Sequence, residues 1–143
     1  MSYIKDYLFI QQTRFPDKFT VTIDIDPVML EVKIPFMTIM VLIENSILHG
    51  FKDVCQEGQL LVRGYRESNR GIIEVRDNGC GIADHIAAAV RELPSDDYDP
   101  PSLKGIGIKN IFLRLKHYYG DMFEFTLERS ETGGTLARIV LQL

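Results

Sequence analysis

Tryptophan is absent from this chain of 143 residues, and cysteine occurs only twice. Two thiols do not form a disulfide framework, so we expect reduced cysteines in a cytosolic setting. The first residues show no basic segment followed by an apolar one, so no secretory leader is expected here. The most apolar stretch, 34–43, contains Pro35 and Thr38 and falls short of the roughly 20 apolar residues that span a membrane. We therefore expect a soluble chain with a buried helix in this stretch.

Positive charge is also in short supply, with 16 basic against 20 acidic residues and a formal net charge of −4. This balance argues against a broad nucleic-acid-binding surface, so no nucleic acid is expected among the partners. Hydrophobic residues make up 45% of the chain and charged residues 25%, which are ordinary globular values and exclude a disordered tail or a long coiled coil. The length fits one domain that covers residues 1–143.

Hydrophobic periodicity divides the chain into helices and strands. Apolar residues at helical spacing predict helices at 3–15, 34–51, 83–93 and 103–120. Alternating apolar and polar residues predict strands at 19–26, 59–67, 71–77, 122–129 and 135–143. Pro35 is expected in the first turn of the second helix. Residues 94–101, rich in proline and aspartate, are expected to form a mobile loop.

The order of these elements restricts the fold. Most strands follow one another in pairs, which favours antiparallel pairing, and the turn chemistry at 68–71 predicts a hairpin between 59–67 and 71–77. A mixed, mostly antiparallel sheet with helices on one face, which is an α/β two-layer sandwich of the α+β class, satisfies this order. Adjacent strand pairs argue against a doubly wound parallel sheet.

The segment DNGCGI, 77–82, follows directly on a predicted strand. Asp-Asn-Gly at such a place most often forms only a tight turn. Alternatively, Asp77 at a rigid strand end accepts a hydrogen bond from an exocyclic amine, while Gly79 and Gly81 let the backbone approach a flat ring. Cys80 has no base beside it in the sequence and is interpreted as a small filler rather than a nucleophile.

Three polar residues interrupt the apolar helix predicted at 34–51, namely Glu44, Asn45 and His49. Buried polar groups need hydrogen-bond partners, and Asn45 and His49, four residues apart, share one helix face. Two interpretations stay open: a histidine satisfied within the core, or a polar site that Asn45 and His49 form together. No cysteine or histidine cluster has the spacing of a zinc site.

A pair of glycines, Gly105 and Gly107, opens the helix predicted at 103–120 within the segment KGIGIKN. Helix N-termini flanked by glycines bind phosphate through free N–H groups and the helix dipole. Alone the pattern is weak. It lacks the third glycine of a dinucleotide-binding fingerprint, because Asn110 stands there, and the Gly-Lys-Ser/Thr ending of a P-loop is also missing.

Together and in this order, the motifs resemble the ATP-binding domain shared by gyrase, chaperone, histidine-kinase and mismatch-repair families, known as the Bergerat or GHKL fold. The order is a helix with Glu-Asn-x-x-x-His, a strand end with Asp-x-Gly-x-Gly, a loop, a helix start with Gly-x-Gly, and Gly-Gly-Thr before the last strand. YLFIQQTRF, ENSILHGF, VRDNGCGI and KGIGIKNIFLRLKHYYG look like the catalytic domain of sensor histidine kinases of the LytS/YesM type. The resemblance covers nearly the whole chain.

The resemblance implies a role for each matching residue. Asn45 would coordinate the Mg²⁺ that bridges the ATP phosphates, His49 would lie near the phosphates, and Asp77 would accept a hydrogen bond from the adenine amine. Residues 83–104 would form the ATP lid, and Thr135 would lie near the adenine edge. The remaining nucleotide-binding residues implied in this way are Gly79, Gly81, Ile82, Lys104, Gly105, Ile106, Gly107 and Ile108.

The chain also departs from the family pattern. Met40 and Val41 stand where the family usually has Gln-Pro, and Leu48 replaces a lysine before the histidine. Relatives that hydrolyse ATP carry a water-activating glutamate one helical turn before the asparagine, at the position of Val41. Weak hydrolysis and phosphoryl transfer to another nucleophile are therefore expected. Glu44 is kept as a candidate catalytic base.

The resemblance thus implies a Mg²⁺- and ATP-dependent protein-histidine kinase that transfers the γ-phosphoryl group to a histidine outside this chain. The dimerisation and phosphoacceptor domain is not expected within 1–143. The implied partners are that domain, in a homodimeric parent kinase anchored in the membrane, and a downstream response regulator, with this domain in the cytoplasm. Two alternatives remain: an anti-sigma-factor-type serine kinase of the same fold, and a non-enzymatic, nucleotide-gated interaction module. The tyrosine-rich first helix and the Arg-Leu-x-x-x-Tyr-Gly stretch at 114–120 favour the sensor kinase.

Overall fold

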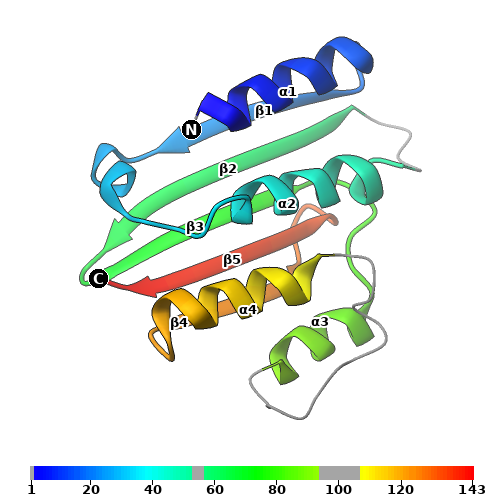
Figure 1. Ribbon diagram of the computed structural model, residues 1–143. Helices are drawn as coiled ribbons and strands as arrows, with labels where there is room; N and C mark the ends of the chain where they lie inside the picture. The colour runs from blue at the N-terminus through cyan, green and yellow to red at the C-terminus, as the bar shows by residue number, and fades with distance from the viewer. Residues whose placement is uncertain (1, 53–56, 94–106) are drawn as a thin grey trace.

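Figure 1 shows the computed structural model, which describes residues 2–52, 57–93 and 107–143. The α-helices in these segments are α1 (Ser2–Arg14), α2 (Thr38–Asn45), α3 (Asp84–Glu92) and α4 (Ile108–Tyr119). A short 3₁₀ helix, η1 (Pro27–Glu31), precedes α2, and one π-helical turn, η2 (Ser46–Gly50), continues it. The strands are β1 (Phe19–Ile25), β2 (Gly58–Glu67), β3 (Arg70–Asp77), β4 (Phe123–Arg129) and β5 (Thr135–Gln142).

The strands form one mixed sheet in the order β1-β2-β3-β5-β4. β1 runs parallel to β2, and every other pair, including the β2–β3 hairpin, is antiparallel. Because parallel neighbours need a crossover, the chain passes through η1, α2 and η2 between β1 and β2. The helices α1, α2 and α4 lie on the same face of the sheet, and α3 packs against β4 (Figure 1). The expected α+β two-layer sandwich is confirmed.

The uncovered face of the sheet carries a row of residues that crosses all of its strands. Asp24, Arg63, Glu74, Arg138 and Thr126 are successive cross-strand partners in this row. Arg63 Nε lies 3.4 Å from Asp24 Oδ2, and Arg138 Nη2 lies 2.7 Å from Glu74 Oε1. Glu74 is buried, and its hydrogen bond with Arg138 raises the pKa of that guanidinium. Neighbouring charges of opposite sign thus connect β1 to β2 and β3 to β5.

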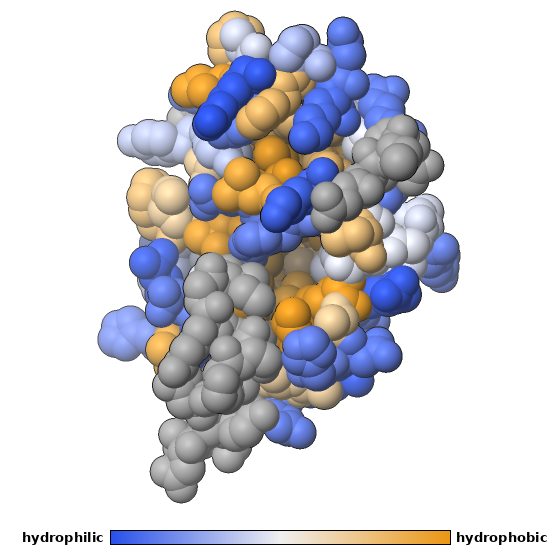
Figure 2. Space-filling view, turned by 90° about the vertical axis from the view of Figure 1, so that its right-hand side faces the viewer, coloured by the Kyte–Doolittle hydropathy of each residue, from blue (hydrophilic) through white to orange (hydrophobic). Residues whose placement is uncertain are grey.

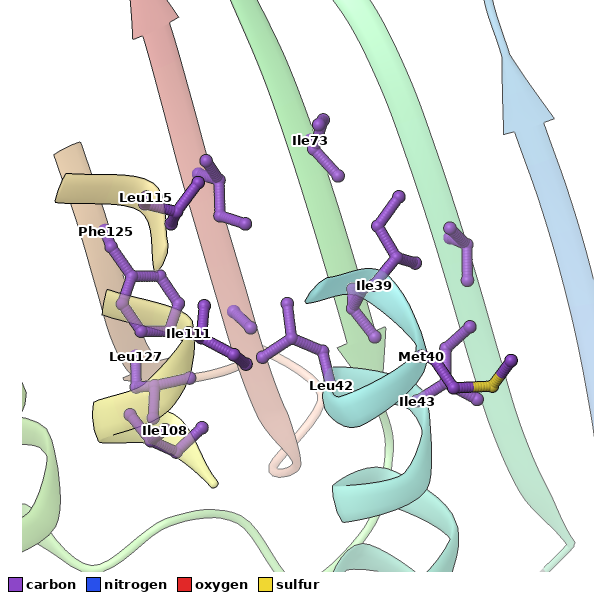
Figure 3. Close-up of a cluster of buried hydrophobic side chains, with 14 of the residues drawn as sticks. Ile39, Met40, Leu42, Ile43, Ile73, Ile108, Ile111, Leu115, Phe125 and Leu127 are labelled. Atoms are coloured by element: carbon purple, nitrogen blue, oxygen red, sulfur yellow. The ribbon is translucent and has the colours of Figure 1, made fainter. Parts of the chain in front are cut away.

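The hydrophobic core lies between the sheet and the helices α2 and α4. Figure 3 shows Leu42 of α2 pointing toward Ile111 of α4, with Ile73 and Phe125 beneath them on the sheet. Leu115 of α4 is fully buried, which its position on the apolar face of the helix explains. Full burial of one such side chain stabilises the fold by about 1.5–3 kcal/mol. The core therefore fixes α2 and α4, and these helices border the site described below.

The prediction of a helix at 34–51 is wrong about where the helix begins. α2 begins at Thr38, so Pro35 precedes the helix instead of lying in its first turn. Met37 has a φ of 69°, a left-handed conformation that a right-handed helix does not contain. Arg114 Nη1 donates a hydrogen bond to the Phe36 carbonyl oxygen at 3.1 Å, so α4 holds this non-helical segment. The apolar pattern of 34–37 thus serves packing and not helix formation.

The helix expected at 103–120 begins, within the described residues, at Ile108. It ends at Gly120 as predicted, where the backbone has a positive φ of 62°. The expected loop at 94–101 and residues 103–106 lie outside the described residues. Among the helices that the structure describes, none has both the length and the apolar character needed to cross a membrane.

Replacing Leu115 by alanine is expected to lower the free energy of unfolding by about 2–5 kcal/mol, because a fully buried side chain leaves a cavity. Leu113→Ala on the same helix is the matched control, since Leu113 is half exposed, and its effect is expected within about 0.5 kcal/mol. Urea unfolding followed by circular dichroism measures both. Equal effects of the two substitutions would contradict the assignment of the core face of α4.

Candidate functional site

A cavity of about 260 Å³ opens where the C-terminal end of α2 approaches the N-terminal end of α4. Figure 2 views the molecule from this side and shows apolar side chains around a hollow near the middle of the face. The walls come from α2, η2, β3, the segment after β3, α3, α4, β4 and β5. The lining residues are Leu42, Asn45, Ser46, His49, Gly50, Val75, Asp77, Gly81, Ile82, Ala83, Ile86, Ile108, Leu127, Thr135 and Ala137.

Asp77, the last residue of β3, is the anionic residue in this cavity wall. It is only 2% exposed, and three donors hold its carboxylate. The Ser46 hydroxyl donates to Oδ2 at 2.8 Å, while the N–H groups of Gly79 and Thr135 donate to Oδ1 at 2.9 and 3.0 Å. A buried polar group needs such partners to offset its lost hydration. Asp77 therefore connects η2, the loop after β3 and the start of β5.

The loop after β3 is held firmly by hydrogen bonds. Asn78 Oδ1 accepts from the Gln59 N–H at 2.6 Å, and Asn78 Nδ2 donates to the Glu57 carbonyl oxygen at 3.2 Å. Cys80 N–H donates to the Gly50 carbonyl oxygen at 2.9 Å. These bonds tie the loop to β2 on one side and to η2 on the other. The loop after β3, which contributes Gly81 and Ile82 to the cavity lining, is therefore held in place.

Two glycines let backbone segments meet around Asp77. A Cβ on Gly79 would lie 2.8 Å from Gly50 Cα, and a Cβ on Gly134 would lie 2.6 Å from Asp77 Oδ1, with the Asp77 carbonyl oxygen closer still. Real Cβ atoms do not approach other atoms this closely. Both positions therefore require glycine for reasons of space.

Asn45 and His49 lie together at the cavity, as their spacing predicts. Asn45 ends α2 and is half-buried, whereas His49 lies in η2 and is exposed, which argues against a histidine satisfied within the core. The helix widens between them, because Phe51 N–H donates to the Ser46 carbonyl oxygen five residues earlier. Such π turns are rare and often mark functional sites.

Glu44, the candidate catalytic base, lies outside the cavity lining. It is half-buried. Burial, and after it the negative charge of Glu44, raises the pKa of Tyr7, so Glu44 sits close to α1. Val41, one turn before Asn45, packs toward the start of α4, where a Cβ on Gly107 would lie 2.9 Å from Val41 Cγ1.

The remaining predicted residues divide into three groups. Ile82, Ile108 and Thr135 line the cavity together with Gly81. Gly107 has a φ of 71° and directly precedes α4, as expected for a helix start. The other predicted residues, Lys104, Gly105 and Ile106, lie outside the described residues, as does most of the predicted lid beyond α3.

Sequence reasoning missed Ser46, which donates the shortest hydrogen bond to Asp77. Ser46 is 7% exposed and follows directly on two polar residues in an otherwise apolar helix. A small hydroxyl at a buried helix position needs a partner, and that requirement is the signal that could have found it. Its partner, 31 residues away, could not be read from local spacing.

This arrangement favours a flat, mostly apolar ring that carries a hydrogen-bond donor. Apolar side chains from opposite walls, such as Ile82 and Leu127, provide the surface, and Asp77 provides the acceptor. For Mg²⁺ the Asn45 amide oxygen is a suitable hard ligand, because this ion keeps several waters and takes the rest of its ligands from phosphates. Among the described residues no group of three or more histidines, cysteines or carboxylates could hold a metal on its own.

Gly134→Ala is expected to lower the free energy of unfolding by about 1–3 kcal/mol, because the added methyl group would press against Asp77. Glu131→Ala in the same turn is the control, since Glu131 is exposed, and its effect is expected to be small. Thermal unfolding of both variants measures the difference. A Gly134→Ala protein as stable as the wild type would refute the close packing of this turn on Asp77.

The known proteins that are similar to this chain include sensor histidine kinases. No protein-family model matches the chain. Sensor histidine kinase YpdA of Escherichia coli is 36% identical over 138 residues, which cover 94% of this chain and 22% of that protein. Sensor protein LytS of Enterococcus faecalis is 33% identical over 134 residues, which cover 92% of this chain and 22% of that protein. The chain thus spans about a fifth of the length of these sensor kinases.

Solved structures of similar fold are also histidine kinases. The catalytic domain of histidine kinase ThkA superposes with a TM-score of 0.66 at 15% identity, covering 97% of this chain and 90% of that one. The histidine kinase domain of the blue-light-activated kinase from Erythrobacter litoralis EL346 gives 0.62 at 21% identity, covering 99% of this chain and 60% of that one. At these identities the structures show the fold, and the sequence relatives place the chain in the family of sensor histidine kinase catalytic domains, in the group of LytS and YpdA.

Proposed function

We propose that this domain binds Mg-ATP in the cavity beside Asp77 and transfers the γ-phosphoryl group to a histidine of a separate phosphoacceptor domain. The observation that carries the proposal is the buried Asp77 carboxylate, held by three donors in an otherwise mostly apolar cavity wall. Such a group is costly to bury and is well suited to select one polar atom of a ligand.

Adenine matches this wall in shape and hydrogen bonding. Among the described residues, Asp77 Oδ1 accepts from two N–H groups and Oδ2 accepts from the Ser46 hydroxyl alone. A carboxylate has about four acceptor positions, so these contacts leave one at Oδ2 for an amine. Apolar side chains such as Val75 and Ile108 would cover the ring. The exocyclic amine of adenine would thus point at Asp77, and the phosphates would extend toward Asn45 and His49.

Phosphates carry the strongest charges of the ligand, and Mg²⁺, when bound, neutralises part of that charge. Asn45 would offer the ion one amide oxygen, and His49 at the exposed rim would contact a phosphate oxygen. Gly107, at the start of α4, adds the positive end of a helix dipole to the same region. The predicted contacts of Lys104, Gly105 and Ile106 with phosphate stay predictions.

In the transfer, the bond between the γ-phosphorus and the β–γ bridging oxygen breaks, a bond between the phosphorus and a histidine nitrogen forms, and ADP leaves. This chain's residues would hold the nucleotide in place for an in-line attack and exclude competing water. Val41 cannot take a proton from water, so we expect weak hydrolysis. Glu44 is outside the cavity lining, so it enters no step of this proposal.

The remaining expectations concern the parent protein. As in the named relatives, which are sensor kinases, we propose a parent that dimerises, is anchored in the cell membrane and passes its phosphoryl group to a response regulator. The domain described here would then face the cytoplasm, where ATP is available.

Asp77→Asn is expected to weaken Mg-ATP binding by about 1–3 kcal/mol, roughly 5- to 150-fold in the dissociation constant. An asparagine can keep its oxygen at the Oδ1 position for the two N–H groups, but its amide then points a donor at the adenine amine. Asp24→Asn on the uncovered sheet face is the control and is expected to bind normally. Calorimetry measures both, and an unchanged Asp77→Asn constant would show that the loop after β3 is only a turn.

We expect this domain to transfer label from radiolabelled ATP, in the presence of Mg²⁺, to the phosphoacceptor domain of a LytS-type kinase. The labelled acceptor should be acid-labile, as phosphohistidine is. Asn45→Ala should reduce this transfer by about tenfold or more, as losses around a metal site commonly do, whereas Asn110→Ala at an exposed position of α4 should not. Acid-stable label would indicate a serine kinase instead. Tight ATP binding with no transfer to any acceptor would indicate a nucleotide-gated interaction module.

A further inference from the structure

Ser46, the first residue of η2, directs its hydroxyl group away from its own helix. A serine within a helix can donate back to the carbonyl oxygen four residues earlier. Here the Leu42 carbonyl oxygen accepts the Ser46 N–H, and the hydroxyl donates instead to Asp77 Oδ2 at 2.8 Å, across 31 residues of sequence. Ser46 is 7% exposed and Asp77 is 2% exposed, so little water reaches either partner. This hydrogen bond is therefore part of the fixed wall of the cavity.

The π turn η2 meets Asp77 at both of its ends. Ser46 donates to the carboxyl group at the start of the turn. At the other end, a Cβ on Gly50 would lie 3.3 Å from Asp77 Cγ and from both carboxyl oxygens, so backbone approaches the carboxyl group there. Phe51, which follows the turn, is buried and stacks on Phe19 with the ring centres 5.8 Å apart. The core thus anchors the turn that places Ser46 against Asp77.

The contacts of Asp77 leave one direction open to a ligand. The N–H groups of Gly79 and Thr135 donate to Oδ1 at 2.9 and 3.0 Å, and Ser46 fills one acceptor position of Oδ2. With these described donors in place, one of about four acceptor positions is left, at Oδ2. Hydrogen bonds at both oxygens hold the plane of the carboxyl group more firmly than bonds at one oxygen. Ser46 therefore fixes the direction of the position that is left.

This corner of the wall offers acceptors to a ligand. A hydroxyl group carries one hydrogen, and that of Ser46 is already donated to Asp77, so the Ser46 oxygen can only accept. A ring amino group finds an acceptor here, whereas a ring carbonyl oxygen would face lone pairs. Without the Ser46 hydroxyl, Oδ2 would have two open positions, and a water molecule could take the one that suits the amine. The preference for an amine would then weaken.

We propose that Ser46 is a positioning residue for nucleotide recognition: it holds Asp77 so that the open acceptor position of Oδ2 faces the amino group of the base. Ser46 acts through Asp77 and needs no contact of its own with the ligand. This role rests on the ATP site proposed above. It goes beyond that site, because it makes the preference for an amino group depend on a residue of η2 as well as on the carboxyl group itself.

ATP and purine riboside triphosphate are suitable probes, because the second carries a hydrogen where adenine carries its amino group. Calorimetry with Mg²⁺ measures both dissociation constants. The wild type is expected to bind ATP about tenfold more tightly than the analogue. Ser46→Ala should weaken ATP binding about three- to tenfold and analogue binding less than about twofold. Ser46→Cys keeps nearly the same side-chain volume but donates only weakly, so it should lose much of the same preference.

Ser130→Ala is the matched control. Ser130 is 6% exposed, its hydroxyl group pairs with that of Thr132 at 2.8 Å, and it lies outside the cavity lining. This variant also loses a buried hydroxyl group, but it should bind both nucleotides as the wild type does. In the nucleotide-free protein, Ser46→Ala should shift the amide resonance of Gly79, which shares the carboxyl group with Ser46, and Ser130→Ala should not.

The outcomes separate this role from the proposed function. Ser46→Ala and Ser46→Cys proteins that keep the full preference for ATP would overturn the positioning role and leave the ATP site standing. An equal loss for ATP and the analogue would also overturn it, since Ser46 would then only support the shape of the cavity. A wild-type domain that binds no Mg-ATP at millimolar concentration would overturn the proposed function and, with it, the role of Ser46.

Discussion

The buried carboxylate of Asp77 is the constraint on which the rest of the site depends. A carboxyl group with 2% exposure needs hydrogen-bond partners inside the protein, and the donors here come from η2, the loop after β3 and the start of β5. Each of these segments must therefore reach the same point in space. Gly79 and Gly134 make the approach possible, because a Cβ at either position would collide with its neighbours. The same contacts that satisfy the charge also build the wall that faces a ligand.

α2 positions polar residues at its two ends. The helix is anchored in the core through residues such as Leu42 and Ile43, which pack between the sheet and α4. Its C-terminal end, continued by η2, presents Asn45 and Ser46 to the cavity beside Asp77, and Thr38 at its N-terminal end is buried beside a second, apolar cavity of about 240 Å³. One buried helix thus positions polar groups at both of its ends, where backbone hydrogen bonding within the helix is incomplete.

Much of the fold could be predicted from the sequence, because strands such as 19–26 follow a strict alternation of apolar and polar residues that the burial of β1 reproduces. The start of α2 could not, since residues 34–37 are as apolar as the helix and only the left-handed backbone of Met37 shows the break. For the site, the spacing of Asn45 and His49 correctly placed both at one cavity. The parallel pairing of β1 with β2 and the bond from Ser46 to Asp77 join distant parts of the chain, and local patterns do not encode such contacts.

A two-layer protein leaves one face of its sheet without a covering layer, and such a face invites stacking of a second sheet. Here the row Asp24, Arg63, Glu74 and Arg138 runs across that face with alternating charge. Any sheet packed against it would have to strip water from these ion pairs without offering new partners. The charged row therefore opposes the stacking of a second sheet on this open face.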